Sequence, residues 1–141
     1  MNHWIGVIGS KLTAERFSGD SNTCFCMPKS CEVGDYVLMY VSTRAAGVKS
    51  GIFSVHEVCN KDESKNTECR RYGMFSGTGE RLVYVDLKLT NKFPKPLSFQ
   101  KIKADRFLSS FSYVRRNFQA TYFPISKKEY KTFVLLGSKI D

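Results

Sequence analysis

The chain has 141 residues and a mass of 16.1 kDa, a length typical of one domain that buries its own hydrophobic core. Hydrophobic residues make up 42% and charged residues 25%, which excludes a disordered tail, a collagen-like repeat and a membrane bundle. The net charge of +9 is unevenly spread: residues 87–131 hold eleven basic and two acidic residues, whereas residues 1–60 hold five of each. This basic excess favours a polyanionic partner, with a solvated surface as the alternative.

Three stretches in the first half of the chain predict strands. Asn2–Ile8 is apolar on both faces, Tyr36–Val41 is rich in β-branched and aromatic residues, and Gly51–Val58 follows a loop of small residues. A short helix is expected over Ser10–Phe17, and the cysteine-containing stretch after it is interpreted as a loop. The polar residues 60–79 predict a long surface connection.

The second half begins with a predicted strand over Arg81–Leu89, which partly alternates between apolar and polar residues. Pro94 and Pro96 lack backbone donors, so the chain is expected to turn there. Short helical pieces are expected over Leu97–Phe111, and Ser112–Ala120 is interpreted as a fifth strand.

The clearest local signal lies near the end of the sequence. Ser126 and Glu129 have the spacing of a capping box, Ile125 can pack against Tyr130, and Gly137 is expected to end the helix that follows. Together these elements predict one mixed α+β domain over residues 1–141, built on a curved, barrel-like sheet.

The five cysteines predict free thiols in a reducing compartment, which points to the cytoplasm. The sequence has neither a signal-like apolar run nor a stretch long enough to cross a membrane. The segment CFCMPKSC lacks a paired C-x2-C, and both histidines lie far from it. We therefore expect no metal site and no cofactor.

Catalytic signals are weak in this sequence. Neither histidine lies beside a Ser or Cys motif; His56 falls within a strand pattern, and His3 is expected at an exposed strand edge. The glycine-rich pieces match no phosphate-binding loop. These observations favour a binding protein over an enzyme.

The binding signals are stronger. Arg115 and Arg116 lie between Tyr113 and Phe118, and cations interleaved with aromatic rings suit phosphate contacts beside a base-stacking surface. The alternative is that the aromatic residues are simply core. A core position is less plausible for Arg115 and Arg116, because arginine rarely enters a core without a partner for its charge.

Six stretches, in order, resemble signature segments of the EVE domain family between about residues 2 and 136. They are MNHWIGVIGS, GDYVLMYVS, SGIFSVHEV, RLVYVDLKL, KPLSFQKIKADRFL and RRNFQATYFPISKKEYKTFVLL. This family shares the PUA-like fold and is related to the YTH readers of methylated RNA. The resemblance implies a mixed β-barrel of five to six strands, short helices packed around it, a C-terminal helix, and a pocket for a single, often modified, nucleobase.

The resemblance also implies site residues, among which Phe25 stands where relatives often have Trp and so offers a smaller stacking surface. The implied base pocket comprises Ser10, Phe25, Tyr40, Ser42 and Asn117, and the expected phosphate contacts are Lys11, Arg115 and Arg116.

The sequence and this resemblance together imply a non-enzymatic, monomeric reader of a modified base in DNA or RNA, with no membrane partner. The alternative is a general RNA-binding accessory protein for tRNA or rRNA that recognises no modified base. A small-molecule enzyme on the same fold is least favoured, because no His-, Cys- or carboxylate-based site is evident.

Overall fold

The computed structural model describes residues 1–9, 22–42, 50–66, 69, 82–118 and 120–139. In this part of the chain, six strands form one sheet in the order β2-β5-β4-β3-β1-β6. The strands are β1 (His3–Ile8), β2 (Thr23–Pro28), β3 (Tyr36–Val41), β4 (Gly51–Lys61), β5 (Leu82–Leu97) and β6 (Tyr122–Ile125). The helices are α3 (Phe99–Ala104), α4 (Ser112–Arg115) and α5 (Lys127–Ser138), with 3-10 turns η1 (Glu63–Lys65) and η2 (Leu108–Ser110).

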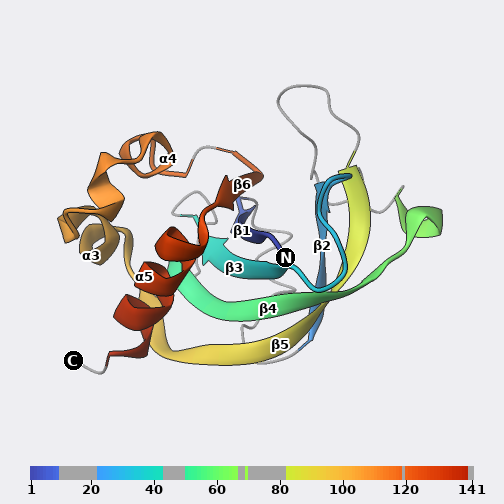
Figure 1. The fold of residues 1–141 in the computed structure, drawn as a ribbon, viewed down its shortest axis with the longest axis horizontal. Helices are drawn as coiled ribbons and strands as arrows, with labels where there is room; N and C mark the ends of the chain where they lie inside the picture. The colour runs from blue at the N-terminus through green and yellow to red at the C-terminus, as the bar shows by residue number, and fades with distance from the viewer. Residues whose placement is uncertain (10–21, 43–49, 67–68, 70–81, 119, 140–141) are drawn as a thin grey trace.

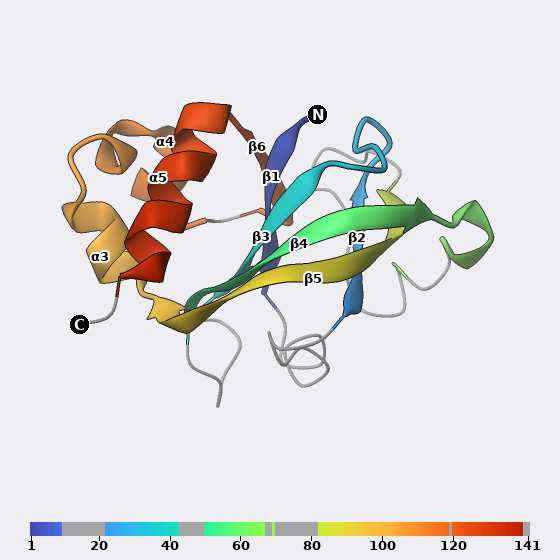
Figure 2. The ribbon, with the colours of Figure 1, turned by 60° about the horizontal axis from the view of Figure 1, so that its bottom comes forward.

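The sheet curls into a half-barrel, as Figures 1 and 2 show, with the long strands β4 and β5 curving across it. Strands β1 and β3 pair in parallel, and the other neighbours are antiparallel. Helices α3, α4 and α5 lie together on one side, and β2 lies on the other. The predicted α+β architecture with a curved sheet and a C-terminal helix is confirmed.

Two hydrophobic clusters hold the domain together. The sheet cluster includes Trp4, Ile8, Phe25, Met27, Val37, Met39, Val85 and Leu87. The helix cluster includes Ile5, Val7, Leu38, Tyr40, Ile102, Leu108, Val114, Phe118 and Phe133. Because successive residues of a strand face opposite ways, β1 and β3 supply both clusters and are apolar on both faces.

Strands β1 and β3 match the predictions, while β4 and β5 are longer than expected. The turn predicted at Pro94 and Pro96 is wrong, because β5 continues through both prolines to Leu97. The pairing with β4 shifts register here: residues 93–96 lie opposite Phe53 alone. In such a bulge, the backbone amides do not all donate hydrogen bonds to the neighbouring strand. Proline has no amide hydrogen to donate, so Pro94 and Pro96 are tolerated there.

Two other assignments need correction. The cysteine stretch interpreted as a loop contains β2, which pairs with β5 from Thr23 to Pro28. The strand predicted over Ser112–Ala120 is wrong: Ser112–Arg115 form α4 and a left-handed turn follows. The helix expected over Ser10–Phe17 lies outside the described residues.

Helix α5 begins as predicted. The Ser126 hydroxyl accepts from the Glu129 amide at 3.1 Å, and the Glu129 carboxylate accepts from the Ser126 amide at 3.1 Å. Gly137 does not end the helix, which continues to Ser138. A Cβ at position 137 would lie 2.1 Å from the Phe93 ring, so glycine is needed for close packing of α5 on β5.

The expectation of free thiols is wrong for two cysteines, because Cys26 of β2 is disulfide-bonded to Cys69. Their separation of 43 residues gave no spacing signal, and the fold alone brings them together. Cys69 is 4% exposed, so the stretch expected to be a surface connection contributes at least this residue to the core.

A third cysteine, Cys31, keeps a free thiol and is buried. Burial, and then the negative charge of Asp35, raise the pKa of this thiol to about 12.

The two histidines are both buried. His3 is 8% exposed rather than at an open edge, and its ring centroid lies 4.5 Å from that of Tyr130. His56 lies in β4, as its strand pattern indicated; it is fully buried and is hydrogen-bonded to Ser54 at 3.2 Å. No helix in the described ranges is both long and apolar enough for a membrane span.

Candidate functional site

A strained turn follows α4. Asn117 has a φ of 55° and Phe118 a φ of 53°, and these are the only non-glycine residues with positive φ in the described ranges. Asparagine tolerates this left-handed conformation, but phenylalanine does not adopt it readily. Each such residue costs about 1–3 kcal/mol, so the rest of the fold must hold the turn in place.

The ring of Phe118 anchors the turn. It is fully buried and stacks on Tyr40 with ring centroids 4.2 Å apart. Phe99, Tyr113 and Phe123 surround it at 5.8–6.1 Å. Complete burial of one such ring stabilises the fold by about 1.5–3 kcal/mol, which is comparable to the strain.

A hydrogen bond connects this turn to α5. The Tyr113 hydroxyl donates to Glu129 Oε2, while Glu129 Oε1 accepts from the Ser126 amide. Burial, and then the hydrogen bond to the Glu129 carboxylate, raise the pKa of Tyr113 far above its ordinary value. The Phe118 amide in turn donates to the Tyr113 carbonyl at 2.9 Å. One carboxylate therefore both caps α5 and fixes the residue from which the turn departs.

The turn presents cations to solvent. Arg115 and Arg116 are exposed and Asn117 is half-buried, while Phe118 points into the core. The two arginines expected to contact phosphates and the asparagine expected in the base pocket are thus neighbours in one surface segment, and their roles there stay predictions. This geometry holds the backbone that carries these three side chains in one conformation at the surface.

The other predicted pocket residues are divided between the two clusters. Tyr40 lies in the helix cluster directly under Phe118, and Ser42 is buried just beyond β3, with its amide donating to the Ile8 carbonyl at 2.9 Å. Phe25 lies in the sheet cluster and is 1% exposed.

Phe25 and Tyr40 face opposite sides of the sheet. A Cβ on Gly6 would lie 3.2 Å from the Phe25 ring and 3.4 Å from Met39 Sδ, so Phe25 faces the Met39 side. Tyr40 is the next residue of the strand and faces the other way. The structure does not bring these two rings together, and a base can stack on Phe25 only if its neighbours move. Ser10 and Lys11 lie outside the described residues.

Positive charge gathers in the layer that contains α3, α4 and α5. Residues 98–139 hold nine basic residues and two acidic ones, a net charge of +7. Both acids have structural partners: Asp105 accepts from the Leu108 amide at 3.0 Å, and Glu129 accepts from Tyr113. The basic residues of this range thus lie in the turn and in or beside helices α3 and α5.

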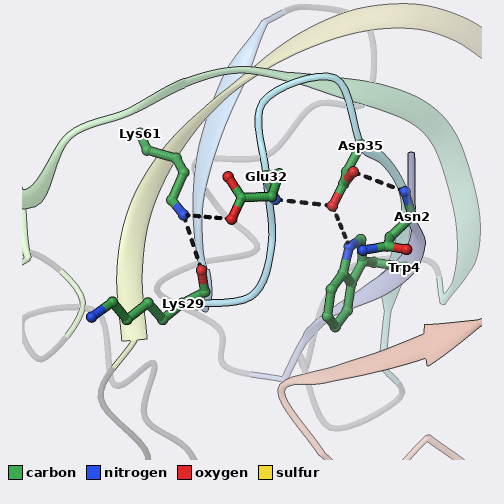
Figure 3. A network of polar contacts seen from close by, with 6 residues as sticks. All are labelled: Asn2, Trp4, Lys29, Glu32, Asp35 and Lys61. Carbon is green, nitrogen blue, oxygen red and sulfur yellow. Dashed lines mark hydrogen bonds and ion pairs between the residues drawn. The ribbon is translucent and has the colours of Figure 1, made fainter.

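The carboxylate of Asp35, which directly precedes β3, has a structural environment (Figure 3). It accepts from the Asn2 amide at 2.9 Å, the Trp4 indole at 3.0 Å and the Glu32 amide at 2.9 Å. Burial alone would raise the pKa of Asp35, but these hydrogen bonds outweigh it and hold the pKa below the ordinary value. All its partners are fixed groups of the fold, which is typical of a carboxylate that stabilises a turn.

In the described ranges, no group of three His, Cys, Asp or Glu side chains is placed so that it could bind a metal ion.

The features that sequence reasoning missed were the left-handed turn and the Tyr113–Glu129 hydrogen bond. The crowding of Tyr113, Phe118 and Phe123 was the available signal, but their contacts depend on the tertiary fold.

Comparison with solved structures identifies proteins of the same fold. A Pseudomonas putida protein gives a TM-score of 0.69 at 14% identity, with 95% of this chain and 98% of that chain covered. The human THYN1 protein, solved in complex with 5-methylcytosine-containing DNA, gives a TM-score of 0.65 at 12% identity, with 100% of each chain covered. The ASCH protein from Zymomonas mobilis gives 0.57 at 15% identity, with 99% of each covered.

Sequence comparison identifies the family. No curated protein matches the chain in sequence. The EVE domain family matches residues 15–135, a range that contains strands β2 to β6, helices α3 and α4, and most of α5. This range covers far more than half of the sequence, and the curled sheet with its C-terminal helix is the PUA-like architecture of that family. The chain therefore belongs to the EVE domain family.

Proposed function

We propose that this protein binds nucleic acid as a monomer, without catalysing a reaction on it, through the turn formed by Arg115, Arg116, Asn117 and Phe118. The observation that carries the proposal is the strain: two consecutive left-handed residues hold an exposed arginine pair on a buried aromatic anchor. Strain that the fold maintains at a charged surface is typical of a preorganised binding site.

The chemistry of the turn suits a nucleotide. Planar guanidinium groups bind phosphate oxygens in a bidentate manner, which supports Arg115 and Arg116 as backbone contacts. The Asn117 amide carries both donors and acceptors and suits the edge of an unstacked base. Tyr40 supports this arrangement from below, since its ring stacks on Phe118.

We further propose that the base is unstacked and that a modified base is preferred. Human THYN1, which has the same fold, was solved with 5-methylcytosine-containing DNA. Unstacking a base costs a few kcal/mol, so a damaged, modified or single-stranded base enters most easily. Burial of one methyl group contributes about 0.8 kcal/mol, which corresponds to roughly fourfold in affinity.

A second candidate is binding of the RNA backbone, as in a tRNA or rRNA accessory protein, without recognition of a modified base. The burial of Phe25 favours it, because the residue expected to stack on the base is only 1% exposed.

The test uses matched oligonucleotides, DNA and RNA, that carry either cytosine or 5-methylcytosine at one central position. Fluorescence anisotropy of the full chain should show tighter binding of the methylated member of a pair. Phe25→Ala should abolish this preference if Phe25 moves to contact the base, with a loss of about 1–3 kcal/mol. Equal affinity for both members would favour the second candidate, and no binding at low salt would exclude both.

A further inference from the structure

The solvent face of α5 carries a group of side chains that the turn does not use. Lys127, Lys131 and Leu135 follow one another at four-residue intervals, with a rise of about 6 Å between neighbours. Lys128 and Thr132 form the adjacent row. These five residues, here called the α5 lysine face, line a shallow hollow of about 480 Å³.

The charges on the α5 lysine face are not balanced along the helix. The only acidic residue of α5, Glu129, is 8% exposed and holds Tyr113. Lys127 and Lys128 lie in the first turn, where the helix dipole disfavours cations, and Lys131 follows four residues after Lys127, where like charges repel. Helix stability alone would favour acidic residues there, so this arrangement points to a role outside the fold.

One of these lysines is held in position. The ammonium of Lys128 lies 4.8 Å from the centroid of the Phe107 ring, next to η2. A cation held over an aromatic ring has less conformational freedom to lose when it binds an anion.

The exposure of Leu135 adds an apolar contact to the positive charge. Leu135 is 62% exposed and is one of three large hydrophobic side chains so exposed in the described ranges. A nucleic-acid strand offers phosphates for lysines and apolar sugar and base faces for a leucine. An acidic peptide offers similar chemistry, but the net charge of +7 over residues 98–139, which include both α5 and the Arg115–Phe118 turn, favours a nucleic-acid strand.

We propose that the α5 lysine face is a second contact surface for the nucleic acid, in which Lys127, Lys128 and Lys131 bind phosphates and Leu135 packs on a sugar or base. This inference rests on the proposed function and extends it. The turn holds the strand at one point, and α5 binds the flanking nucleotides independently of their sequence.

The experiment compares two variants of equal net charge. Lys127→Ala/Lys131→Ala removes two cations from the α5 lysine face, and Lys29→Ala/Lys88→Ala removes two exposed cations from the sheet side as the control. Both are titrated into a labelled 16-nucleotide single-stranded DNA with a central 5-methylcytosine, from 50 to 200 mM salt. Removing a like-charge pair does not weaken α5, so the melting temperature of the α5 variant should not fall.

The α5 variant should bind about 10-fold more weakly than wild type at 100 mM salt, and its salt slope should fall by about 2. The control should change by less than about threefold, which reflects long-range charge alone. Leu135→Ser should weaken binding without changing the salt slope, because it removes an apolar contact and no cation that neutralises a phosphate. Preference for the methylated base should persist in every variant.

An α5 variant that binds like the control, or a Leu135→Ser variant that binds like wild type, would overturn this inference. Such a result, with wild-type binding intact, leaves the proposed function standing. The proposed function fails separately if the wild-type protein binds neither this DNA nor its RNA counterpart at 50 mM salt.

Discussion

Removing the Tyr113 hydroxyl tests whether α5 holds the turn in place. Tyr113→Phe keeps the ring that packs near Phe118 and deletes only the donor to Glu129. Glu129 is 8% exposed, so water replaces that donor poorly, and loss of a hydrogen bond to a charged acceptor costs about 1.5–3 kcal/mol. Each kcal/mol lowers the melting temperature of a domain of this size by roughly 3–4 °C, so we expect a decrease of about 5–10 °C.

The assay combines thermal unfolding, followed by circular dichroism, with oligonucleotide binding of the folded variant. The control is Tyr36→Phe, a half-buried tyrosine of β3 whose ring stacks on Tyr130 outside the turn. Tyr113→Phe should also bind more weakly than the control, because the arginine pair is no longer held in one position. A decrease of less than about 2 °C together with unchanged affinity would refute the role assigned to this hydrogen bond.

Three further experiments test a close packing contact, the disulfide bond and the buried carboxylate that stabilise the fold. Gly137→Ala places a Cβ 2.1 Å from the Phe93 ring, so urea unfolding should show a loss of about 1–3 kcal/mol, although alanine stabilises an open helix; an equal or higher stability would contradict the packing. Reduction of Cys26–Cys69, which are 43 residues apart, should cost about 4 kcal/mol, and equal melting temperatures with and without reductant would argue against the bond. The pKa of Asp35 is lower in the folded than in the unfolded chain, so its carboxylate contributes stability above a pH of about 4. This contribution is lost as the pH falls through the folded-state pKa, so Asp35→Asn should make the free energy of unfolding depend less on pH in the acid range.

Local chemistry explains which elements were predictable. Strands β1 and β3 are apolar on both faces, and this pattern is clear without knowledge of their partners. The capping box at Ser126 and Glu129 is likewise a contact between residues three positions apart. In contrast, β2 is a strand because it pairs with β5 and buries Phe25, which depends on residues about 60 positions away.

The site was predictable in part for the same reason. Arg115, Arg116 and Asn117 are adjacent in sequence, so any structure keeps them together. Their conformation depends on Phe118 packing against Tyr40, a contact between residues 78 positions apart that no local pattern indicates. The grouping of Phe25 with Tyr40 came from resemblance alone, and the pleat of the sheet separates the two.

The central claim is that the strained turn binds the phosphate backbone of a nucleic acid, and Arg116→Ala tests it most directly. Affinity for a labelled oligonucleotide is measured by anisotropy at several salt concentrations for wild type, Arg116→Ala and the exposed sheet control Lys88→Ala. Arg116→Ala should weaken binding to methylated and unmethylated strands alike and reduce the salt slope by about 1, while Lys88→Ala leaves the slope close to wild type. If the slopes of the Arg116→Ala and Lys88→Ala variants are equal, the turn is not the site of phosphate binding.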